Sequence, residues 1–131
     1  MMLSFKDRFV DAIQNGTKIH TIREDTNNRW KPGVKIHFAT GLRTPNYNCF
    51  REGVCTGVQD IIIARYRIVI DILEIELKKW DELAKNDGFD NADAMIDWFR
   101  FHYDLPFFGR LIHWTDYKYI YQETDNNNDM E

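Results

Sequence analysis

The sequence predicts an α+β fold, in which a small, strongly curved sheet or barrel carries helices packed against it. The predicted elements follow the order of one helix, several strands, a helical pair and closing strands. This order lacks the regular alternation of strand and helix that a doubly wound sheet requires. The strands are short and are separated by Gly, Pro and Asn turn signals, as in small barrels. The 131 residues amount to one ordinary domain.

The first half of the chain begins with a helix and continues as strands. Phe5, Phe9 and Ile13 recur at four-residue spacing and predict an amphipathic helix over residues 6–14, which Asn15-Gly16 closes. Alternation and β-branched residues then predict a series of strands. These strands cover residues 17–23, 34–38, 54–63 and 66–77, and residues 41–53 form a long loop between them.

The second half is richer in helix formers. A short helix is predicted up to a break at Asp87-Gly88. A second helix, with Asp90 as its N-cap, runs to about Tyr103. Closing strands are expected over 107–108 and 111–121, a single domain over 1–122, and a disordered acidic tail over 123–131.

The charge of the chain is unevenly distributed. The formal charge is -4, but residues 1–70 carry +5 and residues 71–122 carry -5, so the tail supplies the net value. A basic first half is compatible with an anionic ligand such as a nucleotide or RNA. A surface of mixed charge explains the same distribution more simply.

Composition also favours a cytoplasmic protein without a membrane partner. The N-terminus lacks the basic start and apolar run of a secretory signal. No stretch approaches the roughly 18 uncharged apolar residues of a membrane span. Two cysteines are too few for a disulfide scaffold. The oligomeric state is left open.

One segment concentrates chemistry-bearing side chains. Lys18, His20 and Arg23 stand among threonines just after the first predicted helix. Cationic groups beside hydroxyl groups suit a phosphate, a carboxylate or a developing oxyanion. On composition alone, an edge strand with its basic side chains in water is the simpler interpretation.

The string G-x-K-x-x-T-x-R in this segment resembles the signature of ASCH-domain proteins. It is formed by Gly16, Lys18, Thr21 and Arg23. Its setting is also similar, with Arg8, Phe9 and Ile13 before it and Trp30, Lys31 and Gly33 after it. The resemblance is strong over residues 3–40, and residues 41–66 look like an insertion. It implies a PUA-like small β-barrel with flanking helices.

The resemblance also implies a function connected with RNA or nucleosides. Many ASCH-domain proteins are inferred to bind RNA in a cleft, and one small bacterial branch hydrolyses the amide of N(4)-acetylcytidine. Carried over to this chain, Lys18 would be the general base and Thr21 the nucleophile. The third catalytic residue would be Asp87, where that branch has Glu, and Glu82 is a nearby alternative. Arg23 would bind the ligand.

This chemistry requires the side chains of Lys18 and Thr21 to face the same space. A threonine hydroxyl needs a base, and a lysine serves as one only when its pKa falls well below about 10.4. In a regular strand Lys18 and Thr21 would face opposite sides. We therefore expect an irregular backbone between them. His20 and Trp30 are further candidate ligand-binding residues, although packing explains Trp30 better than stacking on a ligand.

No metal or cofactor is expected from the sequence. The two cysteines are not the close pair of a zinc ribbon, and the histidines lack a ligand spacing. The residues concerned are Cys49, Cys55, His20, His37, His102 and His113.

Three functions are open at this level. The first is a module that binds RNA or a modified nucleoside, and the second is a metal-independent amidohydrolase. The third is a protein-interaction domain in which the motif only supports the fold. An enzyme requires the lysine, the threonine and a carboxylate within hydrogen-bond reach around one pocket, whereas an RNA binder requires a continuous basic groove with exposed rings.

Overall fold

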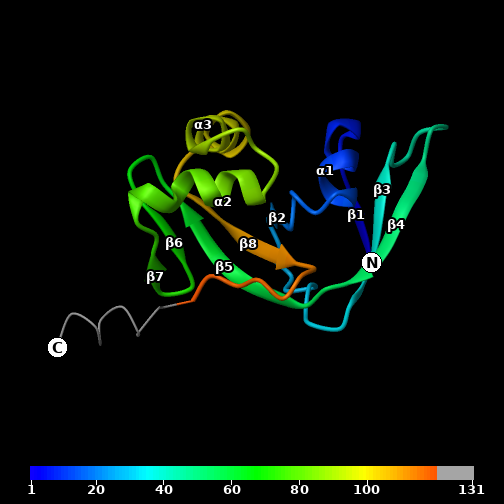
Figure 1. Cartoon of the computed structure of the whole chain (residues 1–131), viewed down its shortest axis with the longest axis horizontal. Coiled ribbons are helices and arrows are strands. Elements are labelled where there is room, and N and C mark those ends of the chain that lie inside the picture. Colours follow the sequence, from blue (N-terminus) through cyan, green and yellow to red (C-terminus); the bar gives the residue numbers. More distant parts are fainter. Residues whose placement is uncertain (121–131) are drawn as a thin grey trace.

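A computed structural model describes residues 1–120 of the chain. Figure 1 shows two groups of strands, with α2 (Trp80–Asn86) and α3 (Ala92–Tyr103) together above one of them and α1 (Val10–Gln14) beside the hairpin of β3 (Lys35–Thr40) and β4 (Asn48–Val54) in the other. The strands are β1 (Met2–Ser4), β2 (His20–Arg23), β3 (Lys35–Thr40), β4 (Asn48–Val54), β5 (Gly57–Ile63), β6 (Ile68–Ile70), β7 (Leu73–Glu74) and β8 (Phe107–His113). The helices are α1 (Val10–Gln14), α2 (Trp80–Asn86) and α3 (Ala92–Tyr103), with 3₁₀ turns at Asp7–Phe9 and Leu77–Lys79.

The strands form two sheets. The first has three strands in the order β1-β3-β4, with β1 parallel to β3. The second has five antiparallel strands in the order β2-β8-β5-β6-β7. The expected α+β class is confirmed. Over residues 1–120, hydrogen bonding does not join the two sheets into the closed barrel that the ASCH resemblance implies.

The two sheets bury two clusters of apolar side chains. The larger lies between the five-stranded sheet and the helices α2 and α3, and includes Ile63, Leu83 and Phe99. The smaller lies under the three-stranded sheet and includes Ile13 and Phe38. Strand β8 contributes to both clusters, because successive side chains of a strand face opposite ways.

The helices agree closely with the pattern in the sequence. The first predicted helix opens as a 3₁₀ turn and closes at Gly16, whose φ of 86° is one that glycine adopts without strain. The N-cap of α3 is Asn91 and not Asp90. Asn91 is the extended residue, so its side-chain oxygen can accept the backbone N–H of Ala94 at 2.8 Å.

The predicted loop over residues 41–53 is wrong in its second half. Strand β4 (Asn48–Val54) occupies that half and pairs with β3, so the connection is only residues 41–47. The strand escaped prediction because it is largely exposed and contains Asn, Arg, Glu and Gly. Gly53 is explained by packing, since a Cβ there would lie 3.1 Å from the ring of Phe38.

Two other strand predictions need correction. The predicted strand 66–77 is a tight hairpin of β6 and β7 that turns at Asp71, whose φ is 55°. A single closing strand, β8, ends at His113, and residues 114–120 continue outside any strand. The predicted tail over 123–131 lies outside the described residues. No helix within residues 1–120 is long and apolar enough to cross a membrane.

Candidate active site

A cavity of about 400 Å³ opens where the motif segment meets the ends of α2 and α3. The segment after β1, strand β2, the start of the 41–47 connection and the two helices all contribute to its wall. The lining residues are Ser4, Phe5, Lys6, Arg8, Phe9, Lys18, Thr21, Ile22, Arg23, Gly41, Leu42, Asp87, Phe89, Trp98, Phe99 and Tyr103.

The backbone between α1 and β2 is irregular, as expected. The N–H groups of Thr17 and Lys18 both donate to the carbonyl of Ala12, each at 2.9 Å, so the chain wraps around the end of α1. The N–H of Ile19 donates to the carbonyl of Asn86, which ties the segment to the end of α2. Strand β2 begins only at His20. Lys18 therefore lies outside the strand, and both it and Thr21 reach the cavity.

The Lys18 side chain is buried, with an exposed fraction of 2%. Its Nζ donates to the carbonyl of His20 at 2.9 Å and to the carbonyl of Asp87 at 2.5 Å. The Asp87 carboxylate oxygen Oδ1 lies 3.7 Å away, beyond hydrogen-bond distance. The shorter side chain of Asp87 thus stops short of the lysine, and its main-chain carbonyl makes the close contact.

Burial changes the acidity of this lysine. The loss of solvation lowers the pKa of Lys18 from 10.5 to about 8, although the charge of Asp87 opposes the shift. The nearby charges of Arg23 and Arg8 lower the pKa further. A substantial fraction of Lys18 is therefore a neutral amine at mildly alkaline pH.

The carboxylate of Asp87 is held from behind by a chain of hydrogen bonds. His20 Nδ1 donates to Asp87 Oδ1 at 2.9 Å, because the carboxylate can only accept. The hydroxyl of Tyr119 donates to His20 Nε2 at 2.7 Å and accepts from Asn86 Nδ2 at 3.1 Å. Burial lowers the pKa of His20 and raises that of Tyr119, so both stay neutral.

Thr21 and Arg23 lie on the same face of β2, two residues apart. Arg23 Nε donates to Thr21 Oγ1 at 3.1 Å, and another guanidinium nitrogen donates to the carbonyl of Ser4 at 2.7 Å. The guanidinium also lies over the ring of Phe5, 5.0 Å from its centre. An arginine has five N–H donors, so three are left for a ligand.

The cavity lining is basic and aromatic. It contains four basic residues against one acid, so it attracts a polar or anionic group. Its rings offer flat surfaces for a planar ligand. The basic residues are Lys6, Arg8, Lys18 and Arg23, and the rings are those of Phe5, Phe9, Phe89, Trp98, Phe99 and Tyr103.

Not every residue singled out in the sequence reaches this cavity. His20 is fully buried behind Asp87 and does not line it. Trp30 lies in the smaller core, and its backbone N–H donates to Asp25, so packing accounts for it. Glu82 lines a different hollow, together with Tyr117.

Several residues at the site were not predicted from the sequence. The aromatic wall from α3, Trp98 and Tyr103, is indistinguishable from core residues in a helical stripe. Tyr119 lies about a hundred positions from His20 and shows no motif. Asn86 was also missed, although its position directly before Asp87 was a signal that could have found it.

Comparison with protein-family models, with curated proteins and with solved structures found no match for this chain. The assignment of a function therefore depends on the geometry of the cavity and on the resemblance of the motif.

The arrangement can support general base catalysis by an amine. It places a buried lysine of lowered pKa, a threonine hydroxyl, a carboxylate and a guanidinium around one space. The described groups at the cavity offer one acidic side chain and no neighbouring histidine on the wall, which is not a metal-ligand set.

Proposed function

We propose that the protein hydrolyses a small amide attached to a planar ring, and that N(4)-acetylcytidine or a related acylated nucleoside is the substrate class. The observation that carries the proposal is the common cavity of Lys18, Thr21 and Asp87, with a lysine pKa of about 8. The resemblance of the motif to the ASCH signature supports the same chemistry. The proposal includes a divergent PUA-like relationship for the fold.

The hydrogen bonds of Lys18 suit a neutral amine. A neutral amine has two N–H donors and one lone pair. The carbonyls of His20 and Asp87 accept those two donors, so the lone pair is free to take a proton. The described hydrogen bonds join Thr21 Oγ1 to Arg23 and not to Lys18, so the proposal places the contact between Lys18 and Thr21 in the substrate complex. In the proposed first step the hydroxyl proton of Thr21 passes to Lys18 while Thr21 Oγ attacks the amide carbon.

The remaining steps use the same groups. The carbon–nitrogen bond breaks, the leaving amine takes the proton from Lys18, and the acyl group stays on Thr21 as an ester. Lys18 then removes a proton from water, which attacks the ester. Cleavage of the ester returns a proton to Thr21 and releases the carboxylic acid.

Arg23 and Asp87 serve supporting roles in the proposal. Arg23 already bonds Thr21 Oγ1, so its other N–H groups are close to the carbonyl oxygen that becomes negative. Asp87 orients Lys18 through its carbonyl and faces the lysine with its carboxylate. The aromatic wall would hold the planar ring of the substrate.

Incubation with N(4)-acetylcytidine tests the proposal. We expect the protein to release cytidine, detected by chromatography, and expect Lys18→Met to abolish release because methionine fills the space without an amine. Lys78→Met is the matched control, because that lysine is exposed and does not line the cavity. Failure of the unaltered protein to release cytidine would discard this substrate, and activity in Lys18→Met would discard the mechanism.

A binding function without catalysis is the second candidate. The basic and aromatic lining favours it, because those groups recognise nucleosides whether or not a bond is broken. The cavity volume of about 400 Å³ suits a single nucleoside better than a polymer. Calorimetric binding of N(4)-acetylcytidine without turnover, lost in Arg23→Ala, would favour this candidate over the enzyme.

A further inference from the structure

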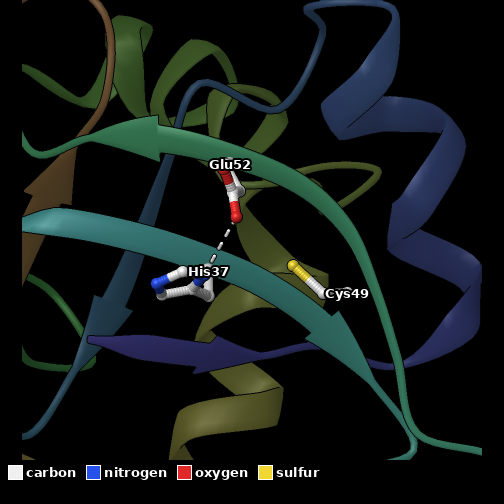
Figure 2. A group of neighbouring side chains, drawn as sticks. All are labelled: His37, Cys49 and Glu52. Carbon is white, nitrogen blue, oxygen red and sulfur yellow. Dashed lines mark ion pairs between the residues drawn. The ribbon is translucent and has the colours of Figure 1, made fainter.

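The face of the β3–β4 hairpin directed away from the core brings three potential metal ligands together. Figure 2 shows His37 on β3 and Cys49 and Glu52 on β4, with the three side chains on one face of the hairpin. Their ligand atoms all lie within 4.8 Å of one another. None of these residues lines the cavity of the proposed active site.

We propose that this face is a binding site for a divalent transition-metal ion, and that zinc is the ion it fits best. An imidazole nitrogen, a thiolate sulfur and a carboxylate oxygen are the three ligand types that zinc uses in proteins. Calcium and magnesium require oxygen ligands, so the sulfur and nitrogen select against them.

A β-bulge produces the cluster. Cys49 and Glu52 are three residues apart, and in a regular strand they would point to opposite faces. The pairing shifts by one residue, because Phe38 pairs with Arg51 whereas Ala39 pairs with Cys49. The extra residue in β4 turns the cysteine to the same face as the glutamate, a known effect of bulges. Linear spacing therefore gives no sign of this site, and spacing was the ground on which no metal was expected at His37 and Cys49.

The geometry is close to that of a bound ion. With zinc bonds of about 2.0–2.3 Å, tetrahedral ligand atoms lie roughly 3.3–3.6 Å apart. His37 Nδ1 and Glu52 Oε1 are already 3.5 Å apart. The ligand atoms lie no more than 4.8 Å apart, so an approach of about 1 Å by the exposed Cys49 thiol completes the tetrahedral spacing.

The three side chains are free to take up an ion. Those of His37 and Glu52 have exposed fractions of 44% and 76%, and an ion pair this exposed contributes little to stability. The Cys49 thiol makes one long contact, 3.5 Å to the carbonyl of Arg51. Three protein ligands leave the fourth position for water or for a donor from another molecule.

Titration with zinc and cobalt tests this site. We expect the full chain, kept in a non-chelating reductant, to bind one zinc ion by calorimetry. Cobalt(II) should produce the charge-transfer absorption of a thiolate ligand. Cys49→Ser should remove that absorption, because the other thiol, Cys55, is buried. His37→Ala and Glu52→Gln should each weaken zinc binding by at least about tenfold, the loss that even outer-shell changes cause.

Matched variants distinguish zinc binding at this site from non-specific zinc binding at exposed side chains. His102→Ala and Glu74→Gln change an exposed histidine and an exposed glutamate elsewhere, and we expect unchanged zinc affinity in both. Circular dichroism confirms that each variant is folded. Absence of saturable zinc binding, or equal binding by Cys49→Ser, would overturn the proposal.

Discussion

The proposed chemistry depends on Lys18, whose amine is buried. Its burial removes solvation, and only part of that loss is recovered from Asp87, whose carboxylate lies 3.7 Å away. A closer carboxylate would hold the proton and raise the pKa. Burial therefore makes the lysine a base, and the long distance to the Asp87 carboxylate leaves most of that effect in place.

The pH dependence of amide hydrolysis follows from this residue. Since the neutral form of Lys18 is the base, activity should rise as pH increases and level off above the pKa of about 8. Below that pH the rate should fall about tenfold per pH unit. Initial rates of cytidine release between pH 6 and about 10 measure this profile.

Arg23→Lys provides the control for the profile. It keeps a positive charge beside Lys18 but removes the bidentate donors, so we expect a lower rate with a similar midpoint. A rate that declined steadily from acid to alkaline pH would exclude Lys18 as the base.

At the scale of elements, the helices could be predicted from the sequence, whereas the hairpins could not. Amphipathic spacing and glycine ends locate α1, α2 and α3, because those signals are local. Strand β4 and the division at Asp71 depend on pairing partners, which a single sequence does not reveal. The sequence places the motif segment after the first helix. It does not predict that Tyr119 and the aromatic residues of α3 lie near this segment, because they are far from it along the chain.

The end of α2 positions the site, and Gly88 makes that position close-packed. Its φ is 95°, and an added Cβ would lie 2.9 Å from the ring of Phe9 and 3.1 Å from Lys18 Cδ. Gly16 has a similar φ of 86° with no atom within 4 Å. Both substitutions to alanine cost about 1 kcal/mol of backbone strain.

We expect Gly88→Ala to destabilise the protein by a further 1–2 kcal/mol, approximately the cost of overpacking, and to lower hydrolysis. Gly16→Ala should show the backbone cost alone. Urea denaturation and the cytidine assay compare the two variants. Equal losses of stability would mean that the neighbours of Gly88 move aside freely.

At the scale of the whole molecule, strand β8 connects the two cores. Leu111 packs in the larger cluster and Ile112 in the smaller one, and both are fully buried. Strand β8 also pairs with β2, which carries Thr21 and Arg23. The cores should therefore unfold together and take the site with them.

Truncation of either residue should have the same consequence. We expect Leu111→Ala and Ile112→Ala each to lower the free energy of unfolding by about 2–5 kcal/mol. Unfolding followed by circular dichroism and by tryptophan fluorescence should give one shared midpoint in each variant. Ile72→Ala, at a fully exposed position, is the control and should change stability by less than about 0.5 kcal/mol. Separate midpoints for the two probes would show that the cores are independent.

Trapping of the acyl-enzyme is the most direct measurement of the proposed mechanism. The protein is quenched in acid during turnover of N(4)-acetylcytidine, cleaved after Lys and Arg, and analysed by mass spectrometry. The peptide of residues 19–23, IHTIR, contains Thr21 as its one hydroxyl. We predict one acetyl group on this peptide, absent in Thr21→Val. Turnover without that modification, or undiminished turnover by Thr21→Val, would contradict the assignment of Thr21 as the nucleophile.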